Sequence, residues 1–230
     1  MAYARACRAQ RLRQGLQQAT AVTGAIYDAG YQASSRFYDE AVSRLGMHPA
    51  EYRRGGAQQR IRFAVVECSL GLVLIAATAK GLCAIEFGDQ SECLLERLEA
   101  RFPQAELIGG DTEFDNWVTQ ITSHIESPAG SLELPLDIRG TAFQHLVWTA
   151  LREIPPGTTL NYAAVARIIG RPGAARAVAG ACAANQLAIA IPCHRVVPAN
   201  GGVGGYRWGT SRKQRLLQRE AQTADSDNQS

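Results

Sequence analysis

The chain of 230 residues has no CxxC pair, no secretory signal and no apolar run that approaches the length needed to span a membrane. Its cysteines are dispersed at Cys7, Cys68, Cys83, Cys93, Cys182 and Cys193. This spacing argues against a disulfide framework and favours reduced thiols in a cytosol. We therefore expect a cytoplasmic protein that has no membrane partner.

Ligand sets for metals and phosphates are also missing. Cys193 and His194 are neighbours, but no third and fourth ligand occur at a spacing that zinc sites use, so we predict no metal site. The glycine-rich stretch 201–209 lacks the Gly-Lys-Ser/Thr ending of a phosphate-binding loop. Its aromatic residues fit better as walls of a pocket for a planar ligand.

Charge is divided unevenly along the chain, although the net charge is only +3. Residues 1–60 carry +5, residues 61–138 carry −9, residues 139–219 carry +10 and residues 220–230 carry −3. Two basic blocks thus flank an acidic one, and basic blocks are typical of proteins that bind polyanions. This pattern favours nucleic acid as the partner.

The first basic block, residues 1–55, predicts an all-α module. Apolar spacing indicates helices near 3–18, 22–29 and 34–45, with a turn at Gly30. The start of this block has arginines and no acidic residue, as transit peptides do, but it continues directly into the helical pattern. The second and third helices form a candidate helix-turn-helix that would present Gln32, Ser35 and Arg36 to a DNA groove. A generic three-helix packing unit is the alternative.

Residues 56–138 predict a small α+β scaffold. Segments 61–67, 71–77 and 82–87 are rich in β-branched and apolar residues and are separated by short turns, which indicates an antiparallel meander. Two helices, marked by Leu94 and Leu98 and by Phe114 and Ile121, and a short extended return at 132–138 complete it. No cluster of catalytic residue types occurs here.

Residues 139–222 predict a mostly helical domain. Phe143, Val147 and Leu151 indicate a helix that a Pro-Pro-Gly turn ends, and helices at 162–169 and 172–184 form a second helix-turn-helix candidate. The last of these is nearly all alanine and glycine, so its backbone can approach a partner closely; tight internal packing is the alternative. A basic helix follows at 210–220, and residues 223–230 are expected to be disordered.

Cys193 is the only cysteine with a histidine neighbour, and Pro192 precedes it. Proline fixes its own φ and favours an extended residue before it, which gives the thiol a rigid mount. Neighbouring side chains of a strand point to opposite faces, so a contact between Cys193 and His194 requires a turn or a bridging water. From these two residues alone, a buried core cysteine is as good an account as a nucleophile.

Three motifs together resemble the O6-alkylguanine-DNA alkyltransferase family. They are Arg-Ala-Val-x-x-Ala-Cys-x-x-Asn at 176–185, Ile-Pro-Cys-His-Arg-Val-Val at 191–197 and Gly-Tyr-x-Trp-Gly…Leu-Leu-x-x-Glu at 205–220. The N-terminal block resembles the second helix-turn-helix of AraC-type regulators through Gly-Tyr at 30–31, Ser-Ser-x-Phe at 34–37 and Gly-x-x-Pro-x-x-Tyr-Arg at 46–53. The resemblance implies a ribonuclease H-like scaffold and a winged-helix-like catalytic domain.

The resemblance also implies an activity and its residues. Cys193 would irreversibly accept an alkyl group from O6-alkylguanine, or O4-methylthymine, in double-stranded DNA. His194 and Glu220 would form with a water the relay that favours the thiolate, and Asn185 would brace the active-site turn. The chemistry agrees, since a thiol is mostly protonated at neutral pH and needs a base or positive neighbours, which His194, Arg195 and the basic block can supply.

Other roles follow from the same resemblance. Arg176 would fill the gap left by the extruded base, and Tyr162 would press on the neighbouring phosphate, because guanine O6 cannot be attacked inside the stack. Ala174 and Ala175 would face DNA on the same helix. The residues expected to line the substrate pocket are Val196, Tyr206, Arg207 and Trp208. No cofactor is implied, and a monomer is expected.

The chain departs from relatives that sense phosphotriesters, because it has no N-terminal set of zinc-binding cysteines. We therefore expect base repair without phosphotriester sensing of its own. The alternative function is an AraC-type transcriptional regulator with a vestigial or non-enzymatic lesion-binding C-terminal domain.

Overall fold

The structure is a computed structural model that describes residues 59–128 and 132–227. The predicted N-terminal helix-turn-helix, with Gln32, Ser35 and Arg36, lies outside these residues. Segments Arg60–Arg101 and Glu106–Ile138 and the chain from Ala142 onward form one compact unit. The predicted scaffold and catalytic regions thus belong to the same unit.

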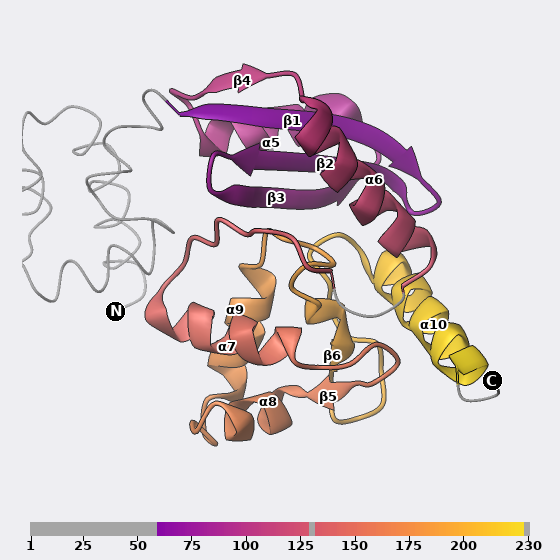
Figure 1. The fold of residues 1–230 in the computed structure, drawn as a ribbon. Helices are drawn as coiled ribbons and strands as arrows, with labels where there is room; N and C mark the ends of the chain where they lie inside the picture. The colour runs from indigo at the N-terminus through magenta and orange to yellow at the C-terminus, as the bar shows by residue number, and fades with distance from the viewer. Residues whose placement is uncertain (1–58, 129–131, 228–230) are drawn as a thin grey trace, which may run out of the picture. The chain divides into compact units, whose positions relative to one another are not determined.

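A four-stranded sheet in the order β3-β2-β1-β4 forms the scaffold (Figure 1). Its strands are β1 (Arg60–Cys68), β2 (Gly71–Thr78), β3 (Gly81–Gly88) and β4 (Glu106–Ile108). The first three strands pair antiparallel, which confirms the predicted meander. The sheet as a whole is mixed, because β4 pairs in parallel with β1. The expectation of an antiparallel sheet missed β4, whose three residues are too few to show a strand pattern.

Two helices cover the sheet. Helix α5 (Ser91–Arg101) packs against β2 and β3 and provides the crossover that a parallel strand such as β4 requires. Helix α6 (Thr112–Glu126) packs against β1 and buries Phe114, Ile121 and Ile125. Asp111 caps α6 by accepting a hydrogen bond from Phe114 N at 2.9 Å. Both helices were predicted from their apolar spacing.

The free edge of β3 holds two distant parts of the chain. Leu82 N donates to Pro135 O at 2.8 Å, and farther along the strand Ala188 N donates to Ile85 O at 2.9 Å. Segment 135–137 and the loop that leads to Cys193 are thereby paired to the same scaffold strand, each through an isolated parallel bridge. The loop before Cys193 is thus fixed to the sheet by backbone hydrogen bonds.

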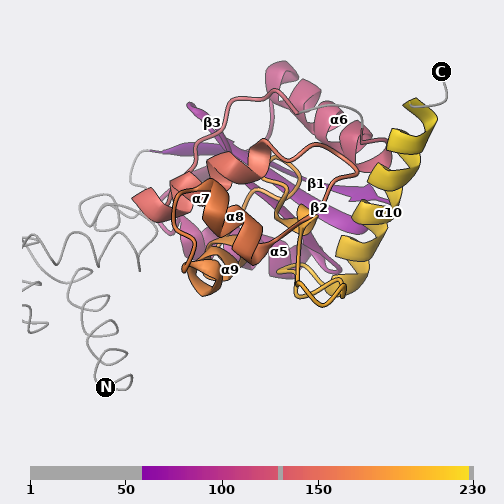
Figure 2. The ribbon, with the colours of Figure 1, turned by 90° about the horizontal axis from the view of Figure 1, so that it is seen from below.

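The C-terminal half is helical. Its elements are α7 (Ala142–Arg152), β5 (Leu160–Asn161), α8 (Tyr162–Ile168), α9 (Ala175–Ala183), η1 (Cys193–Arg195), β6 (Val196–Val197) and α10 (Thr210–Asp227). Figure 2 shows α7, α8 and α9 grouped together, with α10 running along another side.

Two boundaries differ from the predictions. Helix α9 begins at Ala175 rather than at residue 172, because Arg171–Ala174 forms a turn in which Ala174 N donates to Arg171 O at 2.9 Å. Helix α10 continues to Asp227, so residues 223–227 are helical where a disordered tail was expected. The Thr223 hydroxyl donates to Arg219 O at 3.1 Å in this extension.

One hydrophobic core joins the sheet to the helices. It includes Val73, Ile75 and Ile85 from the sheet and Val147, Val165 and Val178 from α7, α8 and α9. Cys193 belongs to the same cluster, so the nucleophile candidate lies at the edge of the core. Within residues 59–128 and 132–227, no helix combines the length and the apolar character that crossing a membrane requires.

Candidate active site around Cys193

Cys193 opens the single turn of 3-10 helix η1 directly after Pro192. Cys193 N donates to Ile191 O at 2.7 Å, and Arg195 N donates to Pro192 O at 3.0 Å. A turn at Cys193, one of the two alternatives that the sequence left open, is therefore present. The cysteine is only 5% exposed, so the thiol is held in a tight, nearly dry setting.

Asn185 ties the loop before Cys193 together. Its amide Nδ2 donates to Ile191 O at 2.8 Å and to the Cys193 sulfur at 3.2 Å. Its Oδ1 accepts from Leu187 N at 2.9 Å. Within this loop Ile189 has a φ of 70°, a left-handed conformation that costs a β-branched residue about 1–3 kcal/mol. The bonds of Asn185 and the pairing to β3 are what hold this strained loop in place.

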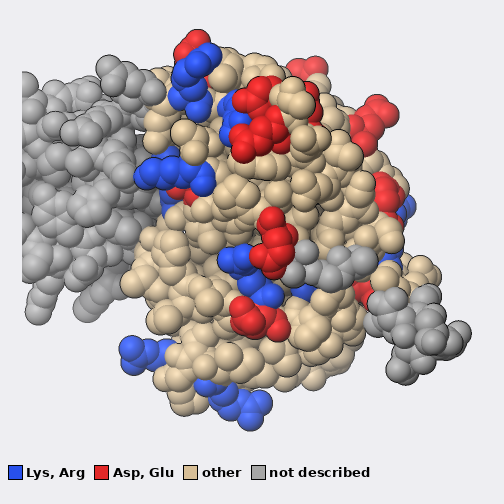
Figure 3. Space-filling view, viewed as in Figure 1, with Lys and Arg blue, Asp and Glu red and all other residues tan. Residues whose placement is uncertain are grey.

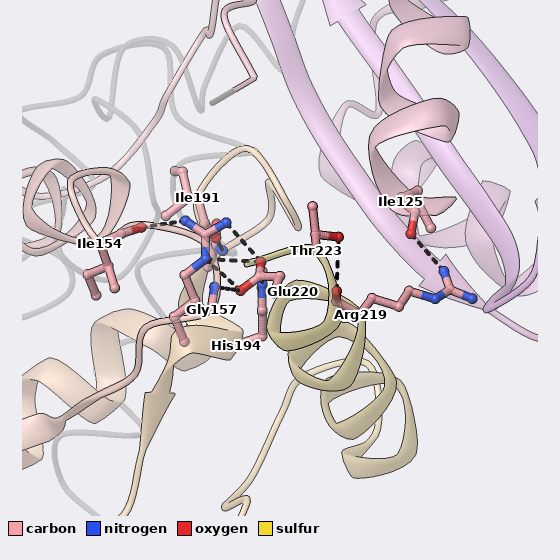
Figure 4. Close-up of polar contacts among 10 residues, drawn as sticks. Ile125, Ile154, Gly157, Ile191, His194, Arg219, Glu220 and Thr223 are labelled. Carbon is pink, nitrogen blue, oxygen red and sulfur yellow. Dashed lines mark hydrogen bonds and ion pairs between the residues drawn. The ribbon is translucent and has the colours of Figure 1, made fainter. Parts of the chain in front are cut away.

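His194 and Glu220 form a buried pair (Figure 4). The His194 Nε2 atom lies 2.8 Å from Glu220 Oε1, and the two residues are 1% and 2% exposed. Because the carboxylate accepts the Nε2 proton, the free lone pair of the neutral ring is on Nδ1. Nδ1 is buried and makes no hydrogen bond to the described part of the chain. The ring is thus oriented with one nitrogen available as a base.

Arg195 and Gly157 complete the surroundings of Glu220. Arg195 donates from Nε and NH2 to the carboxylate at 2.8–3.1 Å, and its NH1 donates to Ile154 O. Gly157 N, in the Pro-Pro-Gly turn after α7, donates to Glu220 Oε2 at 3.3 Å. Burial by itself would raise the pKa of Glu220, but the hydrogen bonds from His194 and Arg195 outweigh it and lower that pKa to about 2. Glu220 is therefore ionised at neutral pH.

Burial dominates the charge state of the other two groups. It raises the pKa of Cys193 to about 11, against the opposing effects of the Asn185 hydrogen bond and the nearby charges of Lys213 and Arg207. Burial also lowers the pKa of His194, against the opposing effect of Glu220. The resting site therefore holds a neutral thiol beside a neutral imidazole.

Of the positive neighbours expected for the thiol, the charges that lower the Cys193 pKa are Lys213 and Arg207 of the basic block. Arg195 was expected to act on Cys193, but its guanidinium is committed to Glu220 and Ile154. Lys213 acts instead: it is fully buried and donates from Nζ to Val196 O at 2.6 Å. The sequence interpretation missed Lys213, although its seven-residue spacing from Glu220 places both residues on one face of a helix.

The predicted pocket residues surround the same site to different degrees. Val196 is fully buried, and Tyr206 packs edge-on against His194 with ring centroids 6.4 Å apart. Trp208 is 3% exposed and packs edge-on against Tyr206 and against Phe87 of β3, at 5.1 and 6.3 Å. Its contact with a scaffold strand is that of a core residue, and its place in a substrate pocket stays a prediction.

Arg207 and Tyr162 lie near Cys193 and are less buried than it is. Arg207 is exposed and donates from NH1 to Ala183 O, at the end of α9, at 3.3 Å. Tyr162 begins α8 and is half-buried; burial, followed by its proximity to Cys182 and Cys193, raises the pKa of its hydroxyl. The positive charge of Arg207 opposes the effect of burial on the Cys193 pKa, whereas the Tyr162 hydroxyl, with its raised pKa, is uncharged at neutral pH.

The candidate DNA-binding side chains lie on α9 and its approach. Arg176 is exposed, and Ala174 and Ala175 are half-buried. In Figure 3 acidic side chains gather over the sheet and α6, whereas the lowest part of this face, over α8, shows only basic ones. No group of three or more His, Cys, Asp or Glu side chains among the described residues is arranged to hold a metal ion.

Comparisons with known proteins bear on this arrangement. Residues 142–222 match the family model described as 6-O-methylguanine DNA methyltransferase, DNA binding domain. Over 149 residues the chain is 40% identical to the inducible methylated-DNA–protein-cysteine methyltransferase of Bacillus subtilis, covering 64% of this chain and 82% of that protein. The chain belongs to the methylated-DNA–protein-cysteine methyltransferase family.

Two further members of this family show its range. Over 224 residues the chain is 46% identical to the bifunctional transcriptional activator/DNA repair enzyme Ada of Escherichia coli K12, covering 97% of this chain and 63% of that protein. The chain thus spans less than two thirds of the length of that protein. The Mycobacterium tuberculosis OGT crystallised in complex with DNA aligns with a TM-score of 0.60 at 33% identity, covering 71% of this chain and 94% of that one.

Proposed function

We propose that the protein repairs DNA by transferring the alkyl group of O6-alkylguanine, and of O4-methylthymine, irreversibly to the Cys193 sulfur. The observation that carries this proposal is a buried thiol, held by Asn185 at 3.2 Å, in the turn that also places His194 on Glu220. A thioether offers no route back to the thiol, so each molecule acts once.

His194 removes the thiol proton in this proposal. The pKa of Cys193, raised to about 11 by burial, keeps the sulfur protonated until substrate arrives. The proton then passes from sulfur, through a water, to Nδ1 of the neutral His194 ring, while ionised Glu220 stabilises the imidazolium. The sulfur–carbon bond forms as the O6–carbon bond breaks, and the released guanine takes up the proton, so no co-reactant is consumed.

The α8–α9 pair binds double-stranded DNA in this proposal. A helix of alanine and glycine suits a narrow minor groove, and Ala174 and Ala175 would face the DNA there. The exposed Arg176 side chain replaces the extruded nucleotide in the stack, and Tyr162 presses on the neighbouring phosphate. Val196, Tyr206, Arg207 and Trp208 surround the extruded base.

The finer domain organisation belongs to the same proposal. The strand order β3-β2-β1-β4, with β4 parallel to β1, supports a ribonuclease H-like scaffold at residues 56–138. The α8–α9 pair, with β5 before it and β6 after it pairing in parallel, supports a winged-helix-like domain at residues 139–222. Residues 1–55 are proposed to form an AraC-type helix-turn-helix, and the protein is proposed to act as a monomer.

Mass spectrometry tests the proposed activity. The protein is mixed with an equimolar duplex that carries one O6-methylguanine, and its peptides are mapped. We expect one methyl group on the peptide that contains Cys193, with stoichiometric loss of the lesion, and none for the Cys193→Ser variant. Binding of the lesion without methyl transfer would instead support the non-enzymatic alternative.

A further inference from the structure

Arg219 precedes the relay residue Glu220 on α10 but reaches in another direction, toward the scaffold (Figure 4). Its NH1 donates to Ile125 O at 2.7 Å and lies 3.5 Å from Glu126 Oε2, both at the end of α6. Its NH2 donates to the hydroxyl of Ser69, in the turn between β1 and β2. A single arginine therefore connects α10 to two scaffold elements.

Ser69 and Glu126 are themselves locked together. Ser69 N donates to Glu126 Oε1 at 2.9 Å, and the Ser69 hydroxyl donates to Oε2 at 2.6 Å. These hydrogen bonds lower the pKa of the Glu126 carboxyl, which keeps it ionised near Arg219. We call Ser69, Glu126 and Arg219 the scaffold anchor. Its charge-assisted hydrogen bonds define a fixed point for the helix.

The anchor holds α10 at the residue directly before Glu220. Three earlier side chains of α10 also bind surrounding backbone: Arg215, one turn before Arg219, and Arg212 and Lys213, about two turns before it. Adjacent residues of a helix project about 100° apart, so Arg219 and Glu220 hold the same turn from two sides. If Arg219 were released, the last turns of α10 could shift, and Glu220 would shift with them.

We propose that Arg219, held by Ser69 and Glu126, is a positioning residue that sets Glu220 and thereby His194 for removal of the thiol proton. This inference rests on the proposed function. The scaffold would then contribute to the reaction, because the β1–β2 turn and the end of α6 hold the helix that carries Glu220. Catalytic groups that are displaced by even about 1 Å lose much of their effect.

The test compares Arg219→Gln with the unsubstituted protein in single-turnover methyl transfer from O6-methylguanine duplex between pH 5 and 9. We expect the plateau rate to fall about tenfold, as misplacement of a general base predicts. We also expect the acidic limb of the profile to move to lower pH. Burial lowers the His194 pKa and Glu220 opposes it, so a displaced Glu220 leaves that pKa lower. The other charged or titratable groups that face His194 are Arg195, Lys213, Tyr206 and, on α6, His124, and they stay in place.

Two further variants separate positioning from stability. Arg215→Gln removes one positive charge from the same helix. It also removes a hydrogen bond to the same β1–β2 turn, where Arg215 donates to Ser69 O at 3.2 Å, but it leaves the scaffold anchor intact. We expect it to keep both the rate and the pH midpoint. Arg219→Lys should recover part of the rate, because its ammonium can still donate to Ile125 O or Ser69.

The outcomes are separable from the proposed activity. A folded Arg219→Gln protein, shown by thermal melting, with unchanged rate and pH midpoint would overturn the positioning role. If that variant does not fold, Glu126→Gln weakens the anchor more mildly and is judged by the same two readouts. Titration of the His194 ring by NMR tests the anchor even if no methyl is transferred, since its midpoint should fall in Arg219→Gln; an unmoved midpoint would overturn the inference.

Discussion

Among the described residues, the scaffold at 60–138 buries two polar side chains, whereas residues 142–220 bury five. The scaffold pair is Thr78 and Glu86, and the five in the second region, which contains Cys193, are Asn185, His194, Arg195, Lys213 and Glu220. Burying a polar group costs free energy unless it is hydrogen-bonded, and a buried charge costs more. Residues 142–220 carry this cost around the thiol that loses its proton in the proposed reaction, and the scaffold largely avoids it.

The two buried glutamates show the difference in detail. Glu86 lies 3.8 and 3.9 Å from Arg97 and Arg101, and its Oε2 has no hydrogen bond within the described chain. Glu220 accepts from a histidine, an arginine and a backbone amide. The Glu86 carboxylate is near two positive charges without a close hydrogen bond to either, whereas hydrogen bonds fix the position of the Glu220 carboxylate. Position matters for chemistry, and charge balance alone is enough for folding.

The largest expected difference in the rate of methyl transfer is between Glu220→Gln and Glu86→Gln. Loss of the Glu220 charge removes the partner that stabilises the His194 imidazolium, so the rate of methyl transfer should fall by roughly 100-fold or more. Glu86→Gln should leave the rate unchanged. Single-turnover rates of both variants, corrected for the folded fraction, test the comparison. A similar loss in both would show that buried charge as such, rather than the arrangement at Glu220, supports the reaction.

A second prediction concerns a substitution that should lower stability but leave the rate of methyl transfer unchanged. Ile121 is fully buried on α6 and belongs to the core. Ile121→Ala should reduce the free energy of unfolding by about 2–5 kcal/mol, because it leaves a cavity, yet leave the rate of the folded protein unchanged. Urea unfolding and single-turnover kinetics on the same samples measure the two effects. A rate that falls in proportion to stability would mean that scaffold packing and the site are not separable in this way.

The sequence predicted the parts that depend on local pattern. The three-strand meander and helices α5, α6, α7 and α8 follow from apolar spacing, and a turn after Cys193 was one of the two expected ways, beside a bridging water, for His194 to reach the thiol. Strand β4 and the start of α9 were missed because a three-residue pairing and a backbone turn leave almost no periodic signal. Long-range pairing, such as that of the active-site loop with β3, has no local signature at all.

Charge was the least reliable guide. Residues 139–219 carry +10, which favoured DNA binding throughout, but several of these groups serve the fold. Arg212 donates to Leu70 O and Gly88 O, and Arg219 donates to Ile125 O. A composition count cannot distinguish a guanidinium that faces DNA from one that binds a scaffold carbonyl. Exposed groups such as Arg176 and Arg207 are the better candidates for contact with DNA.

The smallest expected effect concerns Gly157, whose amide donates to Glu220. Its φ of 75° is left-handed, as is the φ of 80° at Gly201 in the glycine-rich loop. Alanine at either position should reduce the free energy of unfolding by about 1 kcal/mol, because a Cβ disfavours this conformation. Only Gly157→Ala should also slow methyl transfer, by about two- to fivefold, because the 3.3 Å hydrogen bond to Glu220 shifts with the backbone. Thermal melting and single-turnover rates measured side by side check this pair. Equal rates in the two variants would show that the amide of Gly157 merely satisfies a buried carboxylate and that the orientation of Glu220 comes from Arg195 and α10 alone.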